Sequence, residues 1–491
     1  MPASAPRPQV TQVLGDPRDP LGLAADAPLL AAWLDWMQRV AAGTLTPMST
    51  PGHKQRQDLT GAVVAGDAPL YGGLAAIKHA DRLLADVEAR AAALWGADWC
   101  RFSVAGSTHG NQAFCLALGQ PGQEVIITRT LHRSLLLGLV LAGLRPVWVR
   151  PDIDPRSGLP AAVAVRTVRD ALAAHPGACG VILGDPSYVG TTGDLAGHAA
   201  AAHEAGVPLI IDAAWAAYLG FHPGLPPHAI AAGADALVTS AHKTLPAYTQ
   251  GALLLARTER LDAARLNRAF EATHTTSPTG SILASIDAAR ALLARDGPWL
   301  CARLLRGVAA TRRRLREVPG LDVLDGPGVD PAKLVVLLAG TGANGSLVEA
   351  DLISAGMPVE MGDRDTVIPI PTIADDEERL AAFTETLIAS IERHRAAPRR
   401  PAAAAAWTVR PQTVLSPREA FFAKNETVTA IAAIGRVSAE LVAPYPPGVP
   451  VLAPGELITE EALAALREVA ADGGRIAYAA DSCLETFQVV A

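Results

Sequence analysis

The stretches PLIIDAAW (208–215) and ALVTSAHK (236–243) each begin with an apolar run that is typical of a buried strand and continue into polar side chains. Asp212 follows the first run directly, and Lys243 stands shortly after the second. In a parallel sheet both strands would end at the same edge, which is where ligands bind in open α/β folds. Because an acid is costly to bury there without a cationic partner, the two stretches predict a ligand site at the edge of an α/β sheet.

The same alternation of short apolar runs and amphipathic stretches extends over residues 80–260. The expected strands are Glu124–Thr128, Pro146–Arg150, Gly180–Leu183, Pro208–Ile211, Ala236–Thr239 and Ala252–Ala256. The expected helices are Ala80–Leu94, Asn111–Leu118, Ala161–Ala174 and Leu195–Ala205. Repeated β-α-β order predicts a mostly parallel sheet with helices on both faces.

Patterns on either side of this region divide the rest of the chain. Residues 334–370 alternate in the same way on a smaller scale, and a helical stretch with Leu380 and Ile391 on one face follows them. A linker rich in Pro and Ala comes next. We therefore expect an N-terminal arm and helix (1–50), a large domain (51–300), a smaller α/β domain (301–395), a linker (396–410) and a C-terminal domain (411–491).

The composition limits the classes to which the chain can belong. Of its 491 residues, 50% are hydrophobic and 19% are charged, which supplies a large core and excludes wholesale disorder. The net charge of -7 argues against a nucleic-acid partner. The most apolar run, Leu135–Leu144, is shorter than the roughly 20 residues that span a membrane, and no secretory signal is evident. Five Cys without a C-x-x-C spacing favour a reduced, cytoplasmic protein, and no metal site is predicted.

Further polar side chains stand just after the expected strands. They are His132, the segment Asp185–Tyr188, Ser240 and His242. Side chains at several strand ends of one sheet would converge on a single crevice. Ser107 and Thr108 precede a helix, where hydroxyls, backbone N–H groups and the helix dipole suit a phosphate, although such a pair is often only a helix cap.

Lys243 stands out among these residues by its type. Only five of the 42 basic residues are lysines, and an arginine cannot form the imine that a buried lysine forms with an aldehyde. Asp212 could keep a pyridine nitrogen protonated, because a buried acid needs a cationic partner. A phosphate, a pyridinium and an imine-forming aldehyde together describe pyridoxal 5'-phosphate (PLP).

The stretch TSAHKTLPAYTQGALL (239–254) resembles the PLP-attachment signature of the Orn/Lys/Arg decarboxylase family, the bacterial basic amino-acid decarboxylases with the aspartate-aminotransferase (type I) fold. YPPGVPVLAPGE (445–456) resembles that family's C-terminal domain. Other matching motifs, in the same order, are TPGHK (50–54), GSTHGNQAF (106–114), RTLHRS (129–134), DPSYVGTTGDL (185–195) and SPREAFFA (416–423). The resemblance implies the short form of the family, without the N-terminal wing domain. It also implies an α/β fold with a PLP-binding large domain, a smaller α/β domain and a C-terminal α+β domain.

The resemblance implies roles for the matching residues. Lys243 would hold PLP as a Schiff base, Asp212 would pair with the pyridine nitrogen, and His132 would stack on the ring. The other expected cofactor contacts are Ser107, Thr108, Trp215, Ser240, His242, Thr276 and Ser277. Thr276 or Ser277 would reach the partner subunit's site, which implies a homodimer or a higher homo-oligomer. Glu456 is the candidate acid for a cationic substrate side chain.

The implied reaction is decarboxylation of lysine, arginine or ornithine, small-molecule substrates, to the corresponding amine and CO2. Three positions depart from the family pattern: the Asp-Glu-Ala-His usual in short members is Asp212-Ala213-Ala-Trp215, and the usual Tyr is Gly280. An aminotransferase, an aldolase or an oxygen-using amine-forming relative would share the lysine, the acid and the phosphate site, so these activities stay open. A non-catalytic protein of the same fold is a further alternative, against which the retained Lys243 argues.

Overall fold

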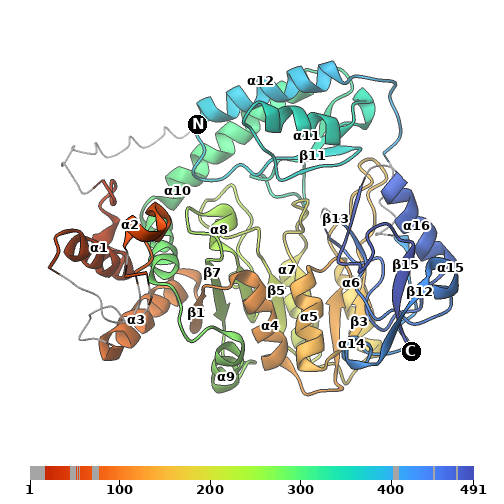
Figure 1. Ribbon diagram of the computed structural model, residues 1–491, viewed down its shortest axis with the longest axis horizontal. Coiled ribbons are helices and arrows are strands. Elements are labelled where there is room, and N and C mark those ends of the chain that lie inside the picture. The colour runs from red at the N-terminus through yellow and green to blue at the C-terminus, as the bar shows by residue number, and fades with distance from the viewer. Residues whose placement is uncertain are drawn as a thin grey trace.

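The computed structural model describes residues 17–44, 51, 53–54, 56–68, 77–401, 408–445, 448–471 and 474–491. Most of the expected N-terminal arm, part of the TPGHK motif and the centre of the expected linker lie outside these residues. Figure 1 shows an α/β body around a sheet, a smaller unit above it and a C-terminal unit (blue) beside it. Within the described part of the chain, no helix is long and apolar enough to cross a membrane.

A seven-stranded sheet forms the centre of the large unit. Its strands are β1 (Trp99–Ser103), β2 (Glu124–Thr128), β3 (Arg145–Val149), β4 (Val181–Gly184), β5 (Leu209–Asp212), β6 (Ala236–Thr239) and β7 (Ala252–Ala256). They lie in the order β1-β7-β6-β5-β4-β2-β3, and β7 pairs antiparallel with both of its neighbours while the other pairs are parallel. The expected mostly parallel sheet is confirmed.

Both faces of this sheet are buried, because successive side chains of a strand point to opposite sides. On β2, Ile126 belongs to one core cluster, and Val125 and Ile127 belong to the other. The helices of the large unit are α3 (Ile77–Trp95), α4 (Gly106–Leu118), α5 (Arg133–Ala142), α6 (Val165–Ala174), α7 (Leu195–Glu204), α8 (Ala241–Thr244) and α9 (Ala263–Thr273). The apolar run Leu135–Leu144 proves to be largely helix α5, which packs against α4.

The sequence pattern does not predict β1, because the polar Arg101 stands at its centre. In the structure the Arg101 guanidinium pairs with the Glu88 carboxylate of α3 at 3.2 Å. Glu88 also accepts a hydrogen bond from the N–H of Phe102 at 2.9 Å. This buried acid satisfies the polar groups that the strand places between the sheet and α3.

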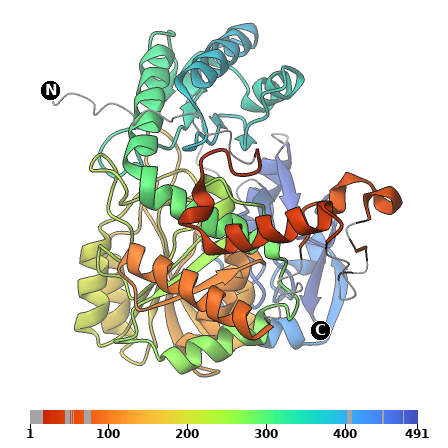
Figure 2. The same cartoon turned by 90° about the vertical axis from the view of Figure 1, so that its left-hand side faces the viewer.

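Helix α10 (Gly280–Arg316) joins the large unit to the smaller one. It runs unbroken through residue 300, so the boundary expected between residues 300 and 301 falls inside a helix. Gly297 and Pro298 are typical of a helix break, but Leu293 and Cys301 on either side of them are fully buried and hold the helix in place. Figure 2 shows that α1 (Pro28–Ala41) lies across α10. The short elements near α1 are η1 (Leu23–Ala25), α2 (Gln57–Thr60) and η2 (Ala62–Val64).

The smaller unit is a four-stranded antiparallel sheet with helices on one side. Its strands, in the order β10-β11-β9-β8, are β8 (Asp322–Val323), β9 (Val336–Leu337), β10 (Met361–Gly362) and β11 (Thr366–Ile368). Its helices are η3 (Ala339–Thr341), α11 (Gly345–Ser354) and α12 (Glu377–Arg393). A separate core cluster that includes Leu334, Val348 and Leu387 holds it together.

The C-terminal unit has α+β structure with its own core, which includes Leu452, Leu466 and Phe487. Its elements are α14 (Pro417–Phe422), β12 (Asn425–Thr429), α15 (Ala430–Ala433), β13 (Ala443–Tyr445), α16 (Glu460–Ala471), β14 (Arg475–Ala477) and β15 (Thr486–Val490). Strand β12 pairs with β15 and β13 with β14, both antiparallel. Helix α14 packs on α5, which attaches this unit to the large one.

Candidate active site

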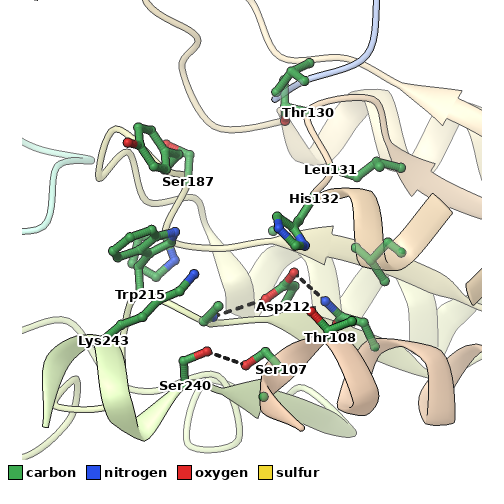
Figure 3. A pocket seen from close by; sticks show the side chains of 18 of the residues that line it. Ser107, Thr108, Thr130, Leu131, His132, Ser187, Asp212, Trp215, Ser240 and Lys243 are labelled. Carbon is green, nitrogen blue, oxygen red and sulfur yellow. Dashed lines mark hydrogen bonds between the residues drawn. The ribbon is translucent and has the colours of Figure 1, made fainter. Parts of the chain in front are cut away.

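A cavity opens at the carboxyl ends of β2, β4, β5 and β6 (Figure 3). The cavity has a volume of about 210 Å³. The expected cofactor contacts that line it are Ser107, Thr108, His132, Asp212, Trp215, Ser240, His242 and Lys243. The structure therefore brings together residues from positions 107 to 243, as the strand-end pattern predicts.

Asp212 is the last residue of β5, and its side chain is almost completely buried. One carboxylate oxygen, Oδ2, accepts a hydrogen bond from Asn111 Nδ2 at 2.8 Å. The other, Oδ1, accepts one from the N–H of Ala214 at 3.2 Å. These neutral donors orient the carboxylate without neutralising it, so a protonated pyridine nitrogen would supply the cationic partner that the site lacks.

Lys243 lies on the short helix α8, directly after β6. Its ammonium nitrogen is 3.9 Å from the centroid of the Trp215 ring. Burial lowers the pKa of Lys243, while the Asp212 and Glu360 carboxylates oppose this shift. An amine that loses its proton more easily is the form that reacts with an aldehyde.

His132 caps the N-terminus of α5 and lies above Asp212 in the cavity (Figure 3). Its Nδ1 accepts a hydrogen bond from the N–H of Ser134 at 3.2 Å and lies 2.8 Å from the Ser134 hydroxyl. Burial lowers the pKa of His132, with Asp212 opposing and Lys243 adding to the shift. With Nδ1 accepting, the ring is neutral and presents its face and its Nε2 to the cavity.

Asn111 and Ser134 are site residues that the sequence analysis does not single out. Asn111 donates through Nδ2 to the Ser134 hydroxyl at 2.8 Å as well as to Asp212, so one amide links the acid to the hydroxyl beside His132. Asn111 comes four residues after Ser107 on α4, which places the two on one helix face. This spacing was a usable signal, because Ser107 is already a predicted contact.

The start of α4 forms the opposite end of the cavity. Ser107 Oγ and Ser240 Oγ lie 2.7 Å apart, and both belong to the cavity wall with Thr108. Gly106 has a φ of 71°, a left-handed conformation that suits glycine, and its N–H donates to the carbonyl of Gln250 at 2.8 Å. His242 Nδ1 bonds the carbonyl of Gly251 at 2.9 Å, which fixes its ring there.

These residues fit PLP by the chemistry of the groups they present. The hydroxyls of Ser107 and Ser240 and the N-terminus of α4 suit a phosphate. Asp212 suits a pyridinium, and the Lys243 amine suits an aldehyde. Trp215 forms the wall beside that amine, with its ring in edge contact with Tyr188 at 5.4 Å.

Thr276 and Ser277 do not line this cavity. They lie exposed in the loop between α9 and α10. That position leaves them accessible to another subunit, so their contact with a partner's site stays a prediction.

Glu456 is placed differently from the expectation that it receives the substrate side chain. It is buried, and its two carboxylate oxygens accept hydrogen bonds from the Arg129 guanidinium, both at 2.8 Å. Oε2 also accepts one from the N–H of Ala453 at 2.8 Å. Because Arg129 satisfies the charge and Glu456 is absent from the cavity wall, this expectation is corrected: the residue joins the C-terminal unit to the large unit.

The chain matches two family models. One is described as "Orn/Lys/Arg decarboxylase, major domain" and matches residues 72–340. The other is "Orn/Lys/Arg decarboxylase, C-terminal domain" and matches residues 401–471. The first match covers the large unit, which holds the cavity, and the second covers most of the C-terminal unit, which contains Glu456.

Full-length relatives agree with these matches. Arginine decarboxylase of Halalkalibacterium halodurans is 31% identical over 459 residues, which cover 90% of this chain and 93% of the relative. Arginine decarboxylase of Bacillus subtilis is 31% identical over 411 residues, which cover 82% of this chain and 84% of the relative. The lysine decarboxylase LdcF of Francisella novicida has a similar structure, with a TM-score of 0.79 over 95% of this chain and 81% of that one; at 18% identity it supports the type I fold alone. The chain therefore belongs to the Orn/Lys/Arg decarboxylase family of amino-acid decarboxylases.

Proposed function

We propose that this decarboxylase uses PLP to convert a basic amino acid to the corresponding amine and CO2, with arginine as the preferred substrate. The observation that carries the proposal is the convergence of Lys243 and Asp212 on one cavity with a hydroxyl-lined helix N-terminus. The choice of arginine rests on the two relatives that bear that name and span most of the chain.

The residues of the cavity would divide the work as follows. PLP, when bound, supplies an electron sink for the electron pair that CO2 leaves on the substrate's Cα. Asp212, oriented by Asn111, would keep the ring nitrogen protonated so that this sink stays effective. His132 would cover the ring face and exclude water from it.

Lys243 would have two roles, holding the cofactor and delivering a proton. Its amine would hold the cofactor's aldehyde carbon until the substrate amine displaces it. The released Lys243 amine would then lie beside Cα, where it can deliver the proton that replaces CO2. Burial, which lowers the pKa of Lys243, favours both the free amine and proton transfer near neutral pH.

The proposal includes a homodimer in the cytoplasm. Within the described residues, Asp212 is the one acid on the cavity wall, and it is committed to the cofactor. We therefore assign to a partner subunit the acid that would recognise a guanidinium or ammonium group. Light scattering on the purified protein checks the dimer, and a monomer with full activity would contradict it.

A substrate panel tests the function. Purified wild-type protein loaded with PLP is incubated with arginine, lysine and ornithine, and the products are identified by mass spectrometry. We expect the amine from arginine at the highest rate, and no amine from Lys243→Ala, which should also lack the wild-type absorbance band near ~420 nm that PLP enzymes show. Keto-acid formation in place of amine, or an undiminished band in the variant, would overturn the proposal.

A further inference from the structure

Lys333 is a second lysine beside the cavity, and it comes from the smaller unit. It lies between β8 and β9, and its side chain is 5% exposed. Its ammonium nitrogen is 4.4 Å from the centroid of the Trp215 ring and 5.4 Å from that of Tyr188. Both rings line the cavity, so Lys333 contacts the aromatic wall of the cavity without lining the cavity itself.

The ammonium group of Lys333 has no hydrogen-bond partner among the residues that the structure describes. Burying a charged group without a partner costs several kcal/mol. This cost is similar to the stability that a protein loses when one member of a buried ion pair is removed. The neighbouring acid Asp330 is already engaged, because Oδ2 accepts from the Tyr218 hydroxyl at 2.6 Å and Oδ1 from the N–H of Ala332 at 2.9 Å. The charge of Lys333 is thus available to a ligand.

The fold holds Lys333 at this place. The N–H of Asp330 donates to the carbonyl of Gly190 at 2.8 Å, which ties the turn to the large unit. The Arg312 guanidinium donates to the carbonyl of Lys333 itself. A Cβ at Gly190 would lie 2.5 Å from Lys333 Cγ. The absence of a side chain at Gly190 therefore makes room for the aliphatic part of the Lys333 side chain.

We propose that Lys333 makes the site prefer the carboxylate-bearing substrate to the amine product. This inference rests on the proposed function. The positive charge attracts the substrate's α-carboxylate and disfavours the product, whose net charge is one unit more positive. Lys333 acts through its charge, so it favours the bound state in which the carboxylate is present, and this attraction ends when CO2 leaves.

The reaction leaves Lys333 unchanged. The bond between Cα and the carboxylate carbon breaks, CO2 leaves, and a proton replaces it on Cα. Lys333 gives and receives no proton in this exchange. It is therefore a positioning residue, and its effect appears in binding rather than in the chemical step.

The selectivity should depend on pH through the charge of Lys333. Burial lowers the pKa of Lys333 to about 8, with the Asp330 and Glu360 carboxylates opposing and Lys243 adding to the shift. The lysine is therefore mostly protonated at neutral pH and loses its charge as the pH rises through about 8. The charged groups near Lys333 in the described residues are Asp330, Glu360, Lys243 and Arg312.

The test compares Lys333→Met with the wild type in two measurements at pH 7. The first is the KM for arginine, and the second is the Kd of the amine product, from calorimetry on the PLP-loaded protein. We expect KM to rise and Kd to fall, each about 3-fold to 10-fold, with kcat changed less than either. Opposite shifts are the signature of charge, because general loosening of the site would weaken both ligands.

Controls separate this inference from the proposed function. Lys333→Arg keeps the charge and should keep the wild-type ratio of Kd to KM, and Lys424→Met, at an exposed lysine of the C-terminal unit, should change neither value. Should Lys333→Met fail to fold, a wild-type ratio that does not fall between pH 7 and pH 9 overturns the inference. Shifts of both ligands in one direction, or no shift, also overturn it. A wild type that releases no amine from any basic amino acid refutes the proposed function instead.

Discussion

Two buried charged sites lie at the same edge of the large sheet, and they differ in how their charges are satisfied. Arg129 directly follows β2 and forms a two-pronged pair with Glu456, with both side chains no more than 2% exposed. The guanidinium also stacks over the Trp148 ring at 4.8 Å. Lys243 follows β6, has an aromatic ring as its nearest partner and makes no ion pair within the described residues.

The difference separates structure from function. A charged pair that satisfies itself fixes two units to each other and leaves nothing to bind. A buried charge that its own chain leaves unpaired persists where a ligand completes it. By this criterion the Arg129–Glu456 pair is a joint, whereas Lys243, Asp212 and Lys333 are assigned to the proposed binding site.

The largest expected effect is on activity, from Asp212→Asn. The asparagine removes the charge and one of the two acceptor oxygens, so it can accept from Asn111 or from Ala214 but not from both, and we expect kcat to fall about 10³-fold, equivalent to about 4 kcal/mol. The free energy of unfolding should fall by about 1 to 3 kcal/mol, because the amide NH2 faces one of the two donors and leaves it without an acceptor. Steady-state kinetics and urea denaturation measure the two quantities. A stable variant with near wild-type kcat would remove Asp212 from the catalytic group.

For Glu456→Gln we expect a different result, which is a loss of stability with little change in KM. It leaves the Arg129 guanidinium buried without its anion, so the free energy of unfolding should fall by about 3 kcal/mol. The KM for arginine should stay close to the wild-type value in the folded fraction, because Glu456 lies outside the cavity wall. Urea denaturation and steady-state kinetics decide this, and a large rise in KM with unchanged stability would restore Glu456 as a substrate residue.

A double variant sharpens the contrast. Arg129→Met with Glu456→Leu removes both charges and replaces them with apolar side chains of similar length. Such replacements are often neutral in stability, so we expect the double variant to recover most of the loss seen in Glu456→Gln. No comparable rescue should exist for Asp212→Asn, since its partner belongs to the ligand.

Sequence reasoning predicts the sheet and the converging residues because both follow from short-range patterns. The strands that lead to Asp212 and Lys243 are apolar up to their last residues, Asp212 and Thr239, and parallel order places their ends together. Strand β1 is not predictable in this way, because Arg101 is compensated by Glu88, a residue on another element.

The partners of charged residues are the part that the sequence does not reveal. Nothing in LAPGE distinguishes Glu456 as a partner of Arg129, since the two are 327 positions apart. The same holds for Lys333, whose position beside Trp215 depends on how the smaller unit docks on the large one. Residue types and strand ends can be predicted, but which charges pair requires the tertiary structure.

The smallest expected effect is a pH-dependent change in stability at Glu88. Its carboxylate is paired less completely with an arginine than the carboxylate of Glu456 is. Burial raises the pKa of Glu88 to about 7, while Arg101, which is partly exposed, and the N–H of Phe102 oppose the shift. Since the folded pKa lies above the unfolded one, its contribution to stability is full below about pH 4.5 and is lost as the pH rises through about 7. Glu88→Gln has no charge to titrate, so the wild type should lose about 2 kcal/mol relative to this variant between pH 5 and pH 8. Urea denaturation at both values tests this, with Glu385→Gln, at an exposed pair with Arg314, as the control that should show no such change. An equal difference at the two pH values would mean that Arg101 satisfies Glu88 as fully as Arg129 satisfies Glu456.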